Sequence, residues 1–209
     1  MWNKVKKVLY KIFIEYFGLI MIGLLAVDIA TKYIMQAVLK NAGNTIELIP
    51  GLLDFQLVYN KGAFAGMLGG TVGHILLILI SVLGTGIMAY GLIKYRYKFS
   101  KGMLIGIILA LPGCFGNLID RLIYVDGKPR GVIDFIHFYI DAINFDWPVF
   151  NVADMLLVVG TIVFAVFYFI YDSKLEKEKK AKLEEIEKQK MEELKNQSSI
   201  IEENKDEQA

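Results

Sequence analysis

One long stretch without a charged side chain constrains the fold of this sequence more than any other feature. From Thr71 to Ile93 no lysine, arginine, aspartate or glutamate interrupts an apolar run. A helix needs about 20 largely apolar residues to cross the hydrocarbon core of a membrane, and this run is long enough. Three further segments, 12–30, 102–120 and 152–171, have polar residues mainly near their ends. The sequence therefore predicts an α-helical membrane protein with four transmembrane helices.

The basic residues indicate how these helices are oriented. Lysines and arginines cluster before the first span, between the second and third spans, and after the fourth, in segments 4–11, 94–101 and 174–180. Cytoplasmic loops carry an excess of these residues, and four crossings place all three clusters on one side. We expect both termini in the cytoplasm, with the two longer connections, 31–70 and 121–150, on the outer face.

The composition changes after the last span. Residues 172–209 carry nine lysines and twelve acidic residues, a net charge of −3, whereas residues 1–171 carry a net charge of +4. Acidic and basic residues four apart in the extension, such as Glu176 and Lys180, favour a solvated helix. We expect a four-span membrane domain over 1–171. Over 172–209 we expect a charged cytosolic C-terminal extension that is partly helical or disordered.

The two outer connections contain strand signals. In 31–70, apolar and polar residues partly alternate around a turn at Pro50-Gly51, and in 121–150 a Gly/Pro turn precedes Val132-Ile133. Such alternation, bounded by turn residues, is typical of short strands. We therefore expect a small extracytoplasmic sheet, a β-cradle, at the membrane surface.

Composition excludes several kinds of chemistry. The single cysteine, Cys114, allows no intramolecular disulfide, and His74 and His137 lie too far apart for zinc-ligand spacing. The net charge is only +1, and no basic face is interleaved with aromatic residues, so nucleic acid is not an expected partner. Any catalysis must therefore use carboxylates, amides and hydroxyls, without a metal or a cofactor.

Polar residues gather at the outer ends of the spans, although the basic loops alone set the orientation. They are Asp28, Lys32, Asn60, Asn117, Asp120, Arg121, Asp134, Asn151 and Asp154. Asp154 has no basic residue three or four positions away, Asp134 has Arg130 four positions before it, and both aspartates lie beside apolar residues. Two close carboxyl groups in such surroundings share one proton, which suits them to activate a water and protonate a substrate. Spacing alone leaves either Asp134 or Asp120 as the partner of Asp154.

Structural roles compete with this interpretation. Asp28 and Lys32 can neutralise each other across one helix turn, and Asp120 can form an interfacial ion pair with Arg121. Asparagines can also tie neighbouring membrane helices together by hydrogen bonds. A non-enzymatic membrane protein, such as a lipid-binding scaffold or a transporter subunit, would use the same groups for these purposes. Replacing one of the paired aspartates by asparagine distinguishes the two, because only an enzyme would lose a catalytic activity.

Five motifs, in order, carry a resemblance to a known family. They are DIATK from Asp28, NKGAFAG from Asn60, GNLIDR from Gly116, GVIDF from Gly131 and FNVAD from Phe150. Together they resemble the lipoprotein signal peptidases (signal peptidase II), over about 28–160. The resemblance implies a four-helix aspartyl endopeptidase of the bacterial cytoplasmic membrane. Such an enzyme removes signal peptides from diacylglyceryl-modified prolipoproteins by cleaving just before the lipidated cysteine.

The resemblance also implies roles for particular residues. The catalytic pair falls on Asp134 and Asp154, which would activate the attacking water. Substrate binding falls on Asn60, Gly113, Asn117, Arg121 and Asn151, and a supporting role on Asp28, Lys32 and Asp120. The implied partners are lipidated prolipoproteins, membrane lipids and globomycin-type inhibitors. The implied protein is a monomer with its active site near the outer face.

Two positions depart from the family pattern. The outer-loop motif exchanges an aromatic and a small residue at Phe64-Ala65, which leaves Asn60 in place but alters the expected packing of the cradle. The pair Pro112-Gly113 keeps only the second of two usual glycines. The charged extension is longer than the family needs, and the resemblance does not explain it.

Overall fold

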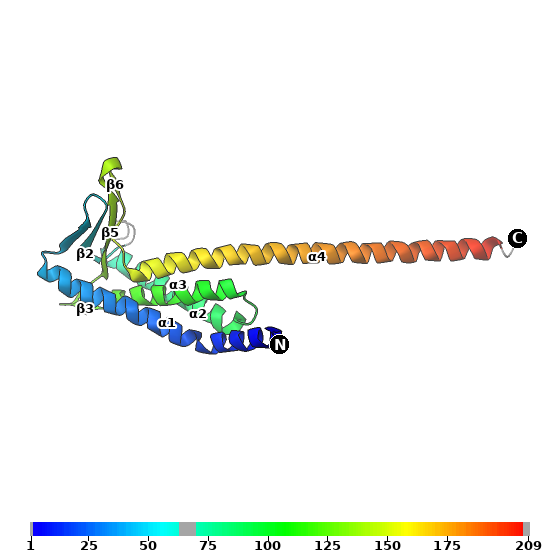
Figure 1. Ribbon diagram of the computed structural model, residues 1–209, viewed down its shortest axis with the longest axis horizontal. Coiled ribbons are helices and arrows are strands. Elements are labelled where there is room, and N and C mark those ends of the chain that lie inside the picture. Colours follow the sequence, from blue (N-terminus) through cyan, green and yellow to red (C-terminus); the bar gives the residue numbers. More distant parts are fainter. Residues whose placement is uncertain (1, 63–69, 207–209) are drawn as a thin grey trace. The chain divides into compact units, whose positions relative to one another are not determined.

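Long helices and a few short strands make up the chain (Figure 1). The structure, a computed structural model, describes residues 2–62 and 70–206, so the exchanged pair Phe64-Ala65 lies outside the described residues. The helices are α1 (Trp2–Asn41), α2 (Gly70–Tyr95), α3 (Lys101–Arg121), the short 3₁₀ helix η1 (Asp141–Ile143) and α4 (Val152–Asp206). The strands are β1 (Thr45–Ile49), β2 (Leu53–Asn60), β3 (Tyr124–Val125), β4 (Lys128–Pro129), β5 (Val132–Ile140) and β6 (Phe145–Asp146).

Among the described residues, four helices are long and apolar enough to cross a membrane, as the sequence predicts. Their candidate spans are Tyr16–Asn41, Thr71–Tyr95, Lys101–Arg121 and Val152–Ile186. The first predicted span, 12–30, covers part of α1, which continues beyond Asp28 and Lys32 to Asn41. These two charged residues do not end the helix, since they are buried and form a salt bridge.

The chain divides into two compact units, residues 1–165 and 166–209. The second unit is helical through Asp206, the last residue of α4. Pairs of glutamate and lysine at helical spacing in this segment agree with that conformation. The predicted cytosolic location of the charged extension stays a prediction.

A small antiparallel sheet lies at the end of the first unit where α1 ends and α4 begins (Figure 1). Its strand order is β1-β2-β5-β6, and the predicted turn at Pro50-Gly51 joins the first two strands. Gly51 has a φ of 73°, a conformation that favours glycine. β2 and β5 pair in a register that places Asn60 opposite Val132. The prediction of a small sheet in the two connections is therefore confirmed.

Glycines allow α3 and α4 to approach closely. A Cβ atom added to Gly106 would lie 2.5 Å from the backbone nitrogen of Phe164, and one added to Gly160 would overlap the backbone of Ala110. Close approach of backbones through small residues is typical of membrane helix pairs. α3 is also the most buried of the four candidate spans, so the other elements of the first unit are organised around it.

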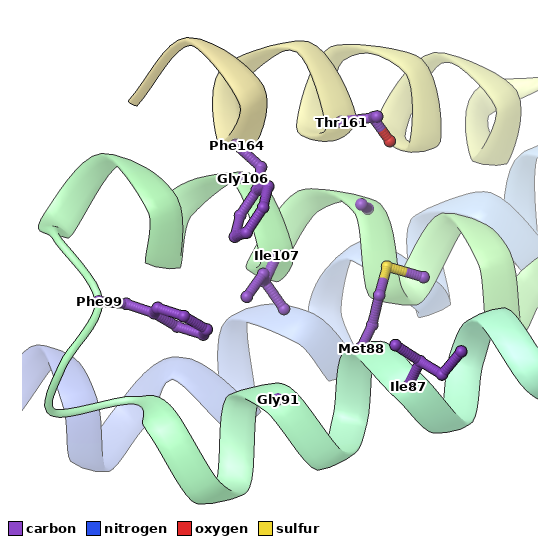
Figure 2. Close-up of a pocket in the computed structure, with 9 residues that line it drawn as sticks. Ile87, Met88, Gly91, Phe99, Gly106, Ile107, Thr161 and Phe164 are labelled. Carbon is purple, nitrogen blue, oxygen red and sulfur yellow. The ribbon is translucent and has the colours of Figure 1, made fainter. Parts of the chain in front are cut away.

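An apolar cavity of about 340 Å³ lies between α2, α3 and α4 (Figure 2). In Figure 2 the side chains of Met88, Ile107 and Phe164 lie around this space. Thr161 carries the one hydroxyl group among the lining residues, and it donates to the Leu157 carbonyl at 2.7 Å. The cavity therefore offers no free polar group, and the candidate chemistry lies elsewhere.

Candidate active site

Asp134 lies on β5 and is almost completely buried, with 2% of its surface exposed. Its Oδ2 accepts a hydrogen bond from Asn60 Nδ2 at 2.9 Å, and its Oδ1 accepts one from Asn151 Nδ2 at 2.6 Å. Asn60 reaches it from the neighbouring strand, because Asn60 and Asp134 form a diagonal cross-strand pair. Both oxygens of this buried carboxyl group are therefore held by neutral amides.

Burial raises the pKa of Asp134 from 3.8 to about 7, and the nearby charge of Asp154 adds to this increase. The hydrogen bonds from Asn60 and Asn151 act in the opposite direction, since they stabilise the ionised form. A group with a pKa near 7 is available in both protonation states near neutral pH. Asp134 is thus suited to give and take a proton.

Asp154 lies in the first turn of α4, where it forms a reciprocal cap with Asn151. The Asp154 backbone N–H donates to Asn151 Oδ1 at 2.9 Å, and the Asn151 backbone N–H donates to Asp154 Oδ2 at 3.1 Å. This capping arrangement satisfies two backbone donors at the start of the helix. The second oxygen, Oδ1, accepts from Asn117 Nδ2 on α3 at 2.7 Å. The start of α4 and its contact with α3 therefore fix the Asp154 carboxylate.

Asn151 connects the two carboxyl groups. It is fully buried, and its side-chain amide donates to Asp134 Oδ1, to Asn117 Oδ1 at 3.1 Å and to the Ile133 carbonyl at 3.3 Å. Its backbone N–H, as described above, donates to Asp154. The structure thus brings together Asp134 and Asp154, which lie twenty residues apart in the sequence.

Lys32 is the centre of a buried ion cluster next to these residues. It is 1% exposed, and its Nζ lies 2.9 Å from Asp28 Oδ2 and 2.9 Å from Asp120 Oδ2. Nζ also donates to Asn117 Oδ1 at 3.0 Å. The predicted pairing of Asp28 with Lys32 is confirmed. Asp28 Oδ1 accepts from the Ala153 backbone N–H at 2.9 Å, so the cluster also ties α1 to the start of α4.

The possible ion pair between Asp120 and Arg121 is not formed. Asp120 is paired with Lys32 and with Arg130, whose guanidinium donates to Asp120 Oδ1. Arg130 follows the β3-β4 hairpin, ten positions after Asp120, so helical spacing in the sequence does not reveal it. Asp120 therefore belongs to the ion cluster, where two cations contact its carboxylate.

Arg121 and Gly113 make contacts that the sequence did not predict. Arg121 Nη1 donates to Ser81 Oγ on α2 at 3.4 Å, and the guanidinium is close enough to Asp154 and Asp134 to attract both. No motif or spacing marks Ser81 as a partner. Gly113 packs against α4, where an added Cβ atom would overlap the Ala153 carbonyl. Substrate binding by Arg121 and Gly113 stays a prediction.

Known proteins are similar to this chain over most of its length. Residues 20–170 match the family model of signal peptidase (SPase) II, which covers more than half of the chain. The chain belongs to the signal peptidase II family. It is therefore a multi-pass membrane peptidase, as the motifs and the four apolar helices indicate.

Individual signal peptidase II proteins are similar over most of the chain. A lipoprotein signal peptidase of Bifidobacterium longum (strain NCC 2705) is 37% identical over 153 residues, which cover 73% of this chain and 78% of that protein. One from Listeria monocytogenes serotype 4a (strain HCC23) is 34% identical over 159 residues, covering 76% and 96%. A solved bacterial membrane enzyme, determined by the in meso method at 2.3 Å, is 30% identical with a TM-score of 0.61. The match covers 77% of this chain and 91% of that one.

Proposed function

We propose that this peptidase is an aspartic endopeptidase that removes signal peptides from prolipoproteins, with Asp134 and Asp154 as its catalytic pair. The observation that carries the proposal is their common partner, since Asn151 donates a hydrogen bond to each carboxyl group. The names of the relatives support prolipoproteins as the substrates.

In the proposed mechanism the two carboxyl groups hold one water and one proton between them. Asp154 takes a proton from the water as its oxygen attacks the scissile carbonyl. Asp134 donates a proton to the carbonyl oxygen, which gives a tetrahedral gem-diol. As the diol collapses, a proton passes to the departing amine. The pKa of about 7 for Asp134 supports its role as the proton donor.

The surroundings of Asp120 support Asp134 as the partner of Asp154. Asp120 contacts the ammonium group of Lys32 and the guanidinium of Arg130. Both of its carboxylate oxygens are therefore occupied by cations of the ion cluster. Asp134 instead accepts its side-chain hydrogen bonds from amides, which orient the group without neutralising it.

The same site is proposed to receive the substrate backbone. Side-chain amides converge on the catalytic pair, and with Arg121 and Gly113 they would position the scissile bond. These amides belong to Asn60, Asn117 and Asn151. We place the site near the outer face of the bacterial cytoplasmic membrane, with both termini cytoplasmic, because the basic clusters lie at the opposite end of the spans. The lipid chains of the substrate would then stay in the hydrocarbon while water reaches the bond before the lipidated cysteine.

A gel-shift assay on a lipidated prolipoprotein tests the proposed pair in the full chain. Asp134→Asn and Asp154→Asn should each lower the processing rate by about 10²- to 10⁴-fold, since each removes one proton-transfer group. Asp126→Asn, in an exposed turn, should leave the rate unchanged. A globomycin-type inhibitor should block processing by the wild-type monomer. Wild-type rates from either dyad variant would show that the pair is wrongly assigned.

The alternative pair has its own test. Asp120→Asn should reduce the amount of folded protein, because it removes one of the two carboxylates that contact buried Lys32 and the carboxylate that contacts Arg130. The rate per folded molecule should nevertheless remain far above that of Asp134→Asn. If Asp120→Asn is inactive while folded and Asp134→Asn is active, the catalytic partner of Asp154 is Asp120.

A further inference from the structure

A polar cavity of about 460 Å³ lies between the end of α1, the end of β2 and the β3-β4 hairpin. Its wall is rich in charged residues, among them Lys40, Lys61, Asp126, Lys128 and Arg130. None of these is assigned a role in the catalytic pair. The cavity is therefore a separate feature of the outer end of the bundle, with its own chemistry.

The lysines of this cavity are available to a ligand. Arg130 is already held by Asp120, whereas Lys40, Lys61 and Lys128 are exposed. Within residues 16–62 and 71–186, no side chain forms an ion pair with any of the three. Lys40 lies 5.9 Å from the centre of the Tyr59 ring, which also lines the cavity. The three lysines and Asp126 together leave an excess of positive charge.

The hairpin that carries Lys128 is well defined by its hydrogen bonds and its turn. Asp126 and Gly127 both have positive φ, 51° and 72°, as a two-residue type I′ turn requires. Lys128 pairs with Val125 across the hairpin, and the Arg130 backbone N–H donates to the Ile123 carbonyl at 3.0 Å. Lys128 is therefore part of a well-defined β-hairpin.

The cavity lies at the level where a membrane-spanning segment ends. Lys40 is next to the last residue of the candidate span Tyr16–Asn41. Val125, which lines the cavity, is 52% exposed, and its neighbour Tyr124 is 53% exposed. Tyr33, whose hydroxyl accepts from Arg130 Nη1 at 3.3 Å, is 46% exposed. Exposed tyrosines beside lysines are typical of the membrane interface, where apolar and polar groups of a lipid meet.

We propose that this cavity binds the phosphate of an anionic phospholipid headgroup, with Lys40, Lys61 and Lys128 as its cationic contacts. The charge selects a phosphodiester that carries a net negative charge over a zwitterionic headgroup. The exposed apolar side chains at its edge favour a lipid over free phosphate, because they offer contacts to the glycerol and acyl groups. The location at the end of a span favours a lipid over an acidic peptide.

Binding of phosphatidylglycerol and of phosphatidylcholine to the full chain in detergent, measured by native mass spectrometry, tests the proposal. Lys40→Gln/Lys128→Gln should weaken phosphatidylglycerol binding by about 30-fold, since each lysine near anionic lipid contributes roughly a factor of five. Binding of phosphatidylcholine should be weaker and unchanged by this pair. The matched control is Lys180→Gln/Lys188→Gln, which removes the same charge from exposed positions in the extension and should leave the affinity nearly unchanged.

A third variant changes the charge in the opposite direction. Asp126→Asn should tighten phosphatidylglycerol binding, because it removes the acidic residue while asparagine still suits the positive φ of the turn. Asp134→Asn should bind phosphatidylglycerol as the wild type does, so the outcome does not depend on the catalytic assignment.

Three results would overturn the proposal. The first is equal affinity for the two lipids, and the second is an equal loss of affinity in the pocket variant and the extension control. The third is inorganic phosphate or hexaglutamate that binds at least as tightly as phosphatidylglycerol and depends on Lys40 and Lys128. That result would assign the cavity to free phosphate or to an acidic peptide.

Discussion

Replacing Asp134 by asparagine should slow processing and also remove a pH-dependent cost to stability. Asp134 is buried, and its pKa is raised from 3.8 to about 7, first by burial and then by Asp154. The folded protein therefore binds this proton more tightly than the unfolded chain does. The stability of the wild type should be greatest where the group is protonated in both states, and it should fall as the pH rises from about 4 to about 7.

The size of this effect follows from the two pKa values. Ionising a group whose folded pKa is about 7 instead of 3.8 lowers the free energy of unfolding by about 4 kcal/mol at pH 8, of which about 2.5 kcal/mol appears between pH 5 and pH 8. Asparagine carries no charge at either pH. Its NH₂ group must face one of two amide donors, Asn60 or Asn151, which costs about 1–3 kcal/mol at every pH. The free energy of unfolding of the variant, relative to that of the wild type, should therefore increase by about 2.5 kcal/mol between pH 5 and pH 8.

Denaturant unfolding of the full chain in detergent at pH 5 and pH 8, followed by tryptophan fluorescence, measures this difference. Asp126→Asn is the matched control, since Asp126 is exposed in a turn and its variant should follow the wild type at both pH values. If the stability difference between Asp134→Asn and the wild type is the same at pH 5 and pH 8, the reasoning is refuted. The buried carboxyl group would then have the same affinity for its proton in the folded and unfolded states.

Three further changes have expected outcomes. Gly160→Ala should lower the free energy of unfolding by about 1–3 kcal/mol, because its Cβ would overlap the α3 backbone, whereas Gly86→Ala has open space and should not. For His137, burial lowers the pKa, but the flanking aspartates, Asp146 first, outweigh it and raise the pKa above 6.5. Its contribution to stability is therefore present below pH 6.5 and lost as the pH rises through the raised value, so unfolding of His137→Gln should differ from wild type most at acid pH. Truncation after Ser173 should leave the gel-shift rate unchanged, since every proposed site residue lies in the first unit.

The four spans could be predicted because apolar length is a local property of a sequence. The end of the helix that contains the first span could not, since it depends on which distant residues meet Lys32. In the sequence Lys32 looks like a charge that ends a span, but Asp28 and Asp120 neutralise it inside the protein. The helix then continues to Asn41 without exposing that charge to hydrocarbon.

The candidate site was only partly predictable for a similar reason. Helical spacing selected Asp154 and left Asp120 and Asp134 as equal partners. The choice depends on the β3-β4 hairpin, which brings Arg130 to Asp120, and on the pairing of β2 with β5, which brings Asn60 to Asp134. The motifs of the family indicated Asp134 without these contacts. Neither spacing nor motif indicated the contact of Arg130 with Asp120.

Amides, and not Lys32, make the side-chain hydrogen bonds to the proposed catalytic pair. The carboxylate of Asp154 and that of Asp134 accept their side-chain hydrogen bonds from amides, whereas Lys32 is directed to Asp28 and Asp120. A cation in direct contact would favour the ionised forms and remove the shared proton that the mechanism needs. Lys32 still acts on the pair through Asn117. By donating to Asn117 Oδ1 it fixes the orientation of that amide, so that the NH₂ group faces Asp154. The ion cluster therefore positions an amide donor of the proposed catalytic pair without contacting the pair itself.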